Sequence, residues 1–213
     1  MADRVAAGLR RGFLSLVRRG LRGVWRRGEL PEGPFVWAAN HHSWWDPFLA
    51  SVVLDQAGRT PCLVMLQENL DRYAFTRRLG VFGTGEPRRG LRYLAAGRVL
   101  VIFPEGELRP AGPPGPLAGG AAWYAGRAGV PLYAVATRVV LRGHEAPEAY
   151  LSFTATDPSG LPACLASGLS DVDALVASSD PRAPLPGYVP VVAGRRSWDE
   201  RIDTIARWSP WRP

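Results

Sequence analysis

Lysine is missing from this chain of 213 residues, because every one of its 26 basic residues is an arginine. Its absence excludes mechanisms that need a lysine side chain: the phosphate-binding P-loop, Schiff-base catalysis and the ion pair of protein kinases. Cysteine is scarce too, and the two present, Cys62 and Cys164, provide no disulfide framework. We therefore expect a protein of a reducing compartment.

Patterns typical of several enzyme classes are also absent. No Gly-x-Ser-x-Gly motif supplies a nucleophilic serine, and no group of histidines and cysteines has the spacing of a zinc site. We therefore expect neither a bound metal nor a cofactor. The N-terminus lacks the continuous apolar core of a secretory signal peptide, which favours the cytoplasmic side.

Positive charge is in excess, with a net charge of +7 and a sequence pI of about 10.2. This balance predicts an anionic partner, either a nucleic acid or a membrane surface. The arginines concentrate in the N-terminal segment rather than between aromatic residues that could stack on bases. The pattern favours a lipid surface, and we expect no nucleic-acid partner.

The first 28 residues are predicted to form a basic amphipathic helix. At 100° per residue one face carries Val5, Leu9, Phe13, Leu16, Val17 and Val24, and the opposite face carries Arg4, Arg11, Arg18, Arg19, Arg22 and Arg26. No run here reaches the roughly 20 apolar residues of a membrane span. The pattern favours a helix lying at a membrane interface. Packing on the domain, with a solvated basic face, is the alternative.

Residues 29–213 are predicted to form one α/β domain, a sandwich in which helices flank a central mixed sheet. Apolar runs predict strands over residues 35–39, 61–66, 80–84, 99–103, 131–138 and 149–154. Helices are predicted over residues 44–55, 69–78, 88–97, 119–128, 167–177 and 197–208. Residues 179–195 are predicted to be an irregular linker. The apolar stripe of the last helix (Trp198, Ile202, Ile205 and Trp208) is predicted to dock onto the domain.

The clearest chemical signal is the segment Asn-His-His-Ser-Trp-Trp-Asp at residues 40–46, directly after a predicted strand. Ser43 is a candidate helix N-cap, and a turn there would bring the Asp46 carboxylate back to the His41 imidazole. Such a pair fixes the tautomer and raises the basicity of the far nitrogen, as a general base requires. With no protein nucleophile in sight, the pair predicts deprotonation of a substrate hydroxyl. A chance pairing is the alternative.

A second block follows the apolar run of residues 99–103, where Pro104-Glu105-Gly106 ends the predicted strand. Together with Asn40-His41-x-Ser43-x-x-Asp46 and the later Val130-Pro131-Leu132, it resembles the glycerolipid acyltransferase family over residues 35–140. That family includes the lysophosphatidate acyltransferases of phospholipid synthesis. The resemblance implies transfer of a fatty acyl group from acyl-CoA or acyl carrier protein to a lipid hydroxyl, first of all that of 1-acylglycerol-3-phosphate or a related lysolipid.

The resemblance also implies roles for individual residues. His41 would be the general base, and Asp46 would hold its imidazole. Asn40 and Ser43 of the first motif, with Glu105 and Gly106 of the second, would belong to the substrate site. Pro131 would shape an apolar acyl groove. The enzyme would act as a peripheral protein at the cytoplasmic face of the membrane.

The departures from the family pattern concern recognition of a phosphate. Glu86 occupies the place where the family usually has an arginine, and Leu108 stands where an arginine would follow the second block. Arg88, Arg89 or Arg109 would then have to supply the phosphate-binding arginine. An acceptor without a phosphate, such as a glycolipid or lipid alcohol, is therefore an alternative. A relative that binds lipid without catalysis is another, and the oligomeric state is open.

Overall fold

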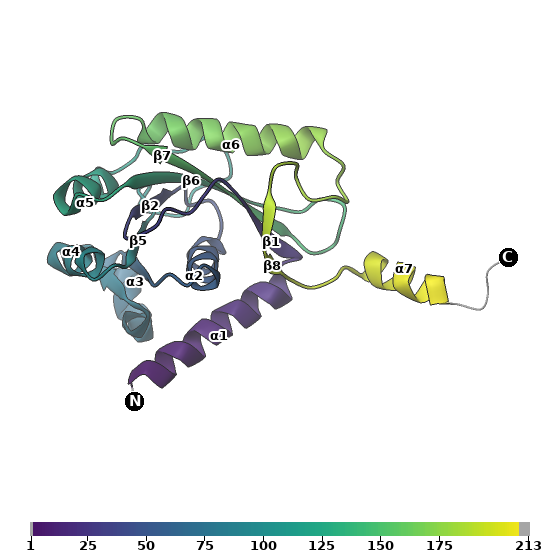
Figure 1. Cartoon of the computed structure of the whole chain (residues 1–213), viewed down its shortest axis with the longest axis horizontal. Helices are drawn as coiled ribbons and strands as arrows, with labels where there is room; N and C mark the ends of the chain where they lie inside the picture. The colour runs from purple at the N-terminus through teal and green to yellow at the C-terminus, as the bar shows by residue number, and fades with distance from the viewer. Residues whose placement is uncertain (1, 209–213) are drawn as a thin grey trace.

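The computed structural model describes residues 2–208, with residues 2, 3, 203 and 205–208 described by their backbone only (Figure 1). Its eight strands form one mixed sheet in the order β4-β3-β5-β2-β6-β7-β1-β8. The strands are β1 Gly23–Arg27, β2 Val36–Ala39, β3 Pro61–Met65, β4 Val81–Gly83, β5 Val99–Ile102, β6 Leu132–Val140, β7 Glu148–Thr156 and β8 Val189–Ala193. The predicted α/β class and the central mixed sheet are thereby confirmed.

Helices cover both faces of this sheet. They are α1 Ala2–Gly20, α2 Asp46–Gln56, α3 Gln67–Arg72, the 3₁₀ helix η1 Ala74–Leu79, α4 Pro87–Ala95, α5 Gly120–Ala128, α6 Leu161–Ser178 and α7 Trp198–Trp208. In Figure 1 α6 runs above the sheet and α1 below it. The strand β2 is apolar at every position because alternate side chains enter two cores, Trp37 on the α1–α2 side and Ala38 on the side of α5 and α6.

The central strands run parallel to one another. β3 pairs in parallel with β4 and β5, and β2 pairs in parallel with β5 and β6. The carboxyl ends of these strands therefore meet at one edge of the sheet, where loops of α/β folds commonly carry the reactive residues. The segments after Ala39 and Ile102, which contain both sequence motifs, leave the sheet at this edge.

The N-terminal prediction is wrong at its end, because the helix stops at Gly20 and residues 23–27 form β1. This strand pairs in parallel with β7 and antiparallel with β8. Trp25 stacks on Tyr150 of β7, with ring centroids 5.3 Å apart. Both neighbours of β1 come from more than 100 residues away, so no local pattern could reveal the pairing.

Helix α1 packs against the domain. Val17 is buried, and the Phe13 ring meets the Phe48 ring of α2 edge to face at 4.9 Å. A side chain at Gly20 would collide with Trp45, so the helix approaches the start of α2 closely. The side of α1 that faces solvent carries the exposed arginines Arg4, Arg11, Arg18 and Arg19.

Three further predictions are corrected by the structure. The supposed linker 179–195 contains β8, whose Pro190 is tolerated because β8 is an edge strand. The predicted helix 69–78 is divided into α3 and η1. The helix predicted over 167–177 begins earlier, at Leu161.

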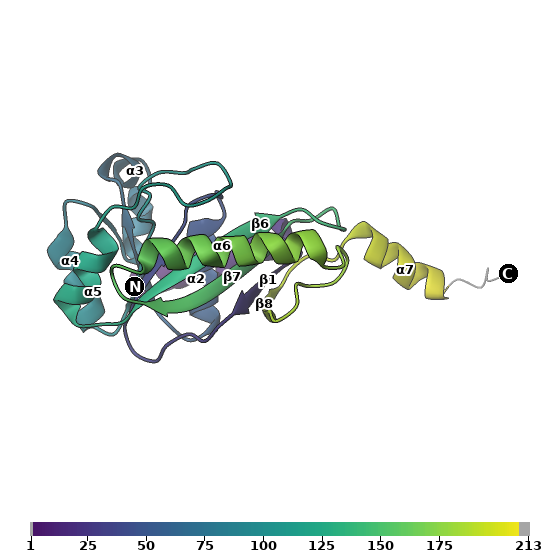
Figure 2. The same cartoon turned by 90° about the horizontal axis from the view of Figure 1, so that it is seen from above.

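The C-terminal helix α7 extends away from the domain (Figures 1 and 2). Trp198 is 61% exposed and Ile202 58% exposed, so the predicted docking of these two side chains is wrong. The side chains of Ile205 and Trp208 lie outside the described part. The start of α7 is held to the domain, since Arg22 pairs with Glu200 at 2.9 Å.

Candidate active site

His41 and Asp46 meet at the carboxyl edge of the sheet, where the chain turns from β2 into α2. The His41 Nδ1–H donates to Asp46 Oδ2 at 2.9 Å. The same oxygen accepts the main-chain N–H groups of His42 and Ser43, at 3.0 and 2.9 Å. Asp46 is buried and is the first residue of α2, where the helix dipole favours a negative charge. The turn is therefore built around this carboxylate.

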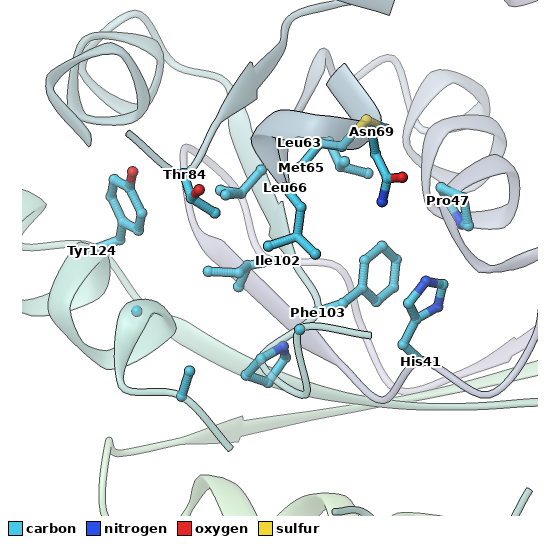
Figure 3. A pocket seen from close by; sticks show the side chains of 15 residues that line it. His41, Pro47, Leu63, Met65, Leu66, Asn69, Thr84, Ile102, Phe103 and Tyr124 are labelled. Carbon is cyan, nitrogen blue, oxygen red and sulfur yellow. The ribbon is translucent and has the colours of Figure 1, made fainter. Parts of the chain in front are cut away.

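The contact with Asp46 determines which nitrogen of His41 is available. Because Nδ1 carries the ring proton and donates it to the carboxylate as a hydrogen bond, Nε2 has a lone pair and can accept a proton. The Phe103 ring stacks against the imidazole with centroids 4.5 Å apart and planes 22° apart. The side chain of His41 remains 22% exposed and borders the space shown in Figure 3.

Two cavities meet at this imidazole, since both are bordered by His41, Pro47, Leu63, Met65 and Asn69. The smaller, of about 390 Å³, extends past Ile102 and Thr84 towards Tyr124 (Figure 3). None of the fifteen described residues that border it is an arginine, an aspartate or a glutamate. Its surface is therefore mostly apolar, with a few uncharged polar groups.

The larger cavity, of about 540 Å³, lies between α1, α2 and η1. Phe13 of α1 and Phe48 of α2 form part of its wall, with Tyr73 and Phe75 on another side. Cys62 also borders it, but burial raises the pKa of this thiol to about 12. The thiol therefore stays protonated at neutral pH and is a poor nucleophile.

Glu105 contacts the His41–Asp46 turn and borders neither cavity. Its side chain is fully buried, Oε2 accepts the main-chain N–H of His41 at 2.6 Å, and Oε1 accepts that of Gly115 at 2.7 Å. Burial alone would raise the pKa of this carboxyl, but the N–H donors of Gly115 and His41, with His42, bring it below its ordinary value. Glu105 is therefore an ionised, buried hydrogen-bond acceptor.

A sequence model of the family described as Acyltransferase matches residues 24–85, which include the His41–Asp46 turn. This part of the chain is similar to the acyltransferase family. Its fold matches the crystal structure of the 1-acyl-sn-glycerophosphate (LPA) acyltransferase PlsC from Thermotoga maritima, with a TM-score of 0.57 and 19% identity. The match covers 81% of this chain and 80% of that one. No curated sequence shows a match to the chain.

The structure places Asn40 and Ser43 away from both cavities. Asn40 is fully buried and links the end of β2 to β6 by two hydrogen bonds. Its amide group donates to the Thr137 carbonyl at 3.0 Å and accepts the Thr137 N–H at 2.8 Å. Ser43 is not the helix N-cap, because α2 begins at Asp46 with Trp45 in the cap position, and the Ser43 hydroxyl accepts the Trp45 N–H from two residues before it. These positions differ from the expected substrate contacts and support the shape of the turn instead.

Pro131 also lies away from both cavities. It precedes β6, so it stands at the amino end of a strand that runs parallel to β2, and its carbonyl accepts the N–H of Val36 at 2.9 Å. His41 follows the opposite end of β2. A groove at the imidazole therefore cannot involve Pro131, which differs from the expectation. Gly106, in contrast, borders the smaller cavity, and its φ of 76° suits glycine.

The arginines expected to replace a phosphate-binding residue are not among those bordering the cavities. Arg89 donates to Glu86 at 2.8 Å, and Arg77 donates to the same carboxylate at 3.1 Å. These donors hold the pKa of Glu86 below its ordinary value. Arg109 pairs with Glu107 at 2.7 Å, and Arg88 is exposed on α4.

Several residues of the site carry no signal in the sequence. Asn69 and Tyr124 reach the cavities from α3 and α5, and nothing in their local sequence marks them. Phe103 was visible only as the end of a strand, although its position next to the Glu105 motif could have suggested a contact with His41. Trp44 and Trp45 divide their roles, since Trp44 borders the larger cavity and Trp45 packs against α1.

Proposed function

We propose that this protein is an acyltransferase that moves a fatty acyl group from a thioester, acyl-CoA or acyl carrier protein, to a lipid hydroxyl, with His41 as the general base. The observation that carries the proposal is the His41 Nδ1–Asp46 hydrogen bond of 2.9 Å, which leaves Nε2 as the accepting nitrogen of a residue that borders both cavities. A base at such a junction can reach a hydroxyl in one cavity and a carbonyl in the other.

The proposed reaction is a direct transfer. His41 Nε2 takes the proton of the acceptor hydroxyl while its oxygen attacks the thioester carbonyl and forms a tetrahedral intermediate. When the intermediate collapses, the carbon–sulfur bond breaks, and the imidazolium returns its proton to the leaving thiolate. Asp46 stabilises the imidazolium between these two steps, as carboxylates do in other His–Asp pairs.

The two cavities suit different parts of the substrates. The larger one has aromatic walls from Phe13, Phe48 and Phe75, which favours the acyl chain of the donor. The smaller one combines apolar walls with the amide of Asn69 and the hydroxyls of Thr84 and Tyr124, which favours an acceptor with polar groups near its hydroxyl.

Replacement of the base tests the proposal. His41→Ala should abolish transfer from labelled acyl-CoA or acyl carrier protein to every member of a lipid-acceptor panel. His144→Ala is the matched control, because His144 contacts Asp199 and the Arg182 carbonyl far from both cavities. Undiminished transfer by folded His41→Ala protein would remove the catalytic claim. Absence of transfer in the wild type with every donor and acceptor would favour a lipid-binding relative.

The acceptor class has two candidates. The family resemblance favours 1-acylglycerol-3-phosphate or a related lysolipid. The smaller cavity favours an acceptor without a phosphate, since none of its described residues is an arginine and Arg89 already pairs with Glu86. A panel of lysophosphatidate, a monoacylated glycolipid and a long-chain alcohol separates the candidates. Preference for lysophosphatidate over both uncharged acceptors would exclude the second.

A membrane surface is the proposed source of the acceptor. Exposed apolar side chains stand at the borders of the two cavities, namely Trp44, Leu66, Tyr73, Phe75 and Leu108. The exposed arginines of α1 supply charge complementary to anionic lipids. The helix α6 has the length and hydropathy of a membrane span, but it packs across β6 and β7. We therefore assign peripheral contact to α1 and the cavity borders.

Vesicle flotation tests this contact. The protein should float with anionic vesicles, and the double change Arg18→Gln with Arg19→Gln should weaken flotation, because both side chains are exposed on α1. Arg195→Gln with Arg196→Gln removes the same charge elsewhere and should have a smaller effect. Binding to DNA or RNA in a mobility-shift assay without flotation would contradict the proposal.

A further inference from the structure

The second histidine of the motif, His42, belongs to a buried chain of charged groups. Its side chain is 4% exposed, against 22% for His41. Arg138 Nη1 donates to His42 Nδ1 at 2.7 Å, and Glu105 Oε1 lies 3.3 Å from His42 Nε2. His42 therefore sits between a buried cation and a buried carboxylate and borders neither cavity.

These two contacts determine the tautomer of His42. A guanidinium can only donate, so Nδ1 must accept and cannot carry a proton. The ring proton is then on Nε2, where it donates to Glu105. His41 has the opposite arrangement, with its proton on Nδ1 facing Asp46. His42 is thus a neutral bridge rather than a base.

The chain continues from Arg138 to the surface of α6. Arg138 lies on β6 with its side chain 6% exposed, and its Nε and Nη2 donate to the two carboxylate oxygens of Asp173, both at 2.8 Å. Such bidentate pairs fix the plane of the guanidinium. Asp173 is half exposed, so it can be changed without opening the core.

At its other end the chain holds the backbone of the catalytic histidine. Glu105 accepts the N–H of His41 at 2.6 Å, and the His41 carbonyl accepts the N–H of Arg109 at 2.8 Å. The loop that follows is fastened too, because Arg138 donates to the Gly112 carbonyl and Glu105 accepts the Gly115 N–H, both at 2.7 Å. Ala118 at the end of this loop borders the smaller cavity.

We propose that His42 and Arg138 are positioning residues that act through Glu105 to hold the backbone of His41 and the loop of residues 109–118. The inference rests on the proposed role of His41 as the base. Misplacement of a catalytic group lowers the rate even when binding is intact, so changes in the chain should lower kcat more than they raise KM. A merely structural ion network would instead change stability alone.

A change at the exposed end tests the proposal with little risk to folding. Asp173→Asn should lower kcat about threefold or more with KM nearly unchanged, a modest effect for a partner outside the site. Asp171→Asn is the matched control, because Asp171 lies on the same helix, is similarly exposed and pairs with Arg27 instead. Equal kcat values for the two variants, at equal thermal midpoints, would overturn the proposal.

His42 itself offers a rescue experiment. His42→Leu leaves Glu105 and Arg138 without their partner and should lower kcat about 10- to 100-fold, as loss of supporting hydrogen bonds does elsewhere. His42→Gln can still accept from Arg138 and donate to Glu105, so it should recover most of the loss. If Gln and Leu reduce kcat equally while both proteins are folded, the bridging role is wrong.

Nuclear magnetic resonance of the imidazole nitrogens tests the inference without any activity. In ¹⁵N-histidine-labelled protein near neutral pH, His42 should carry its proton on Nε2 and His41 on Nδ1. Asp173→Asn should shift the His41 signals, and Asp171→Asn should not. A protonated His42, an Nδ1–H tautomer, or His41 signals unchanged in Asp173→Asn would overturn the proposal. Failure of transfer in the wild type would instead contradict the proposed function. The nuclear magnetic resonance measurement would then still test whether His42 and Arg138 position His41.

Discussion

His41 and His42 are adjacent in the sequence, yet their surroundings differ in every respect. His41 is open to two cavities, is held by one carboxylate through Nδ1 and keeps Nε2 available. His42 is enclosed, and both of its nitrogens are occupied by Glu105 and Arg138. The difference shows that the residue type alone does not define a base. We propose that the base is the imidazole whose second nitrogen has no protein partner among the described residues.

The largest expected effect comes from removing the negative charge of Asp46, the partner of the accessible His41. Asp46→Asn should lower kcat about 10³- to 10⁴-fold, because the imidazolium loses its stabilising carboxylate and the Nδ1–H tautomer is no longer enforced. The matched control is Asp55→Asn on the same helix, where the carboxylate pairs at 3.8 Å with Arg10 on α1. Steady-state kinetics check this prediction. A loss below tenfold would mean that Asp46 does not activate His41 as a base, and the functional contrast between His41 and His42 would be lost.

The next effect concerns Glu105, the partner of the enclosed His42. Glu105→Gln should lower kcat about 10- to 100-fold, because an amide nitrogen cannot accept the N–H of His41 or Gly115. Glu107→Gln, two residues later and 63% exposed, is the control and should leave kcat unchanged. If Glu105→Gln instead raised KM for the acceptor with kcat intact, Glu105 would be a substrate contact, as the family resemblance implied.

A smaller effect is expected at Glu86, two residues after Thr84, which borders the smaller cavity. Glu86→Arg should increase the use of lysophosphatidate relative to an uncharged acceptor several-fold, because it reverses the charge beside Arg77 and Arg89. Glu68→Arg on exposed α3 makes the same change of charge and is the control. The ratio of kcat/KM for the two acceptors is the measurement. An unchanged ratio would remove position 86 from acceptor selection.

The smallest effect is on acid stability. The pKa of Glu105 is lowered in the folded protein from its ordinary value of 4.5, because hydrogen bonds outweigh the opposing effect of burial. Its contribution to stability is therefore complete above pH 4.5 and is lost as the pH falls through the folded pKa. Glu105→Gln should lose less stability than the wild type over that acidic range, as measured by thermal midpoints. Parallel curves would contradict the lowered pKa.

The motif at residues 40–46 was sufficient to predict that Asp46 would reach His41, because the two are five positions apart and a turn lies between them. The α/β class was also predictable, since β2 and β5 are continuous apolar runs. β1 and β8 were missed because each is short and is stabilised by partners distant in sequence. The hydrogen-bond partners of Glu105 were missed for the same reason, since His41 after β2 and Gly115 of the loop 109–118 reach it only in the folded chain.

The sequence by itself determined the family motifs, the parallel core strands and the local His41–Asp46 pair, because these depend on neighbouring residues and on apolar periodicity. Only the tertiary structure decided that Glu105 faces His42 rather than a substrate and that Pro131 stands at the far edge of the sheet. It also decided that two cavities meet at His41. Those facts follow from strand order and direction, which bring together residues that are 60 to 100 positions apart.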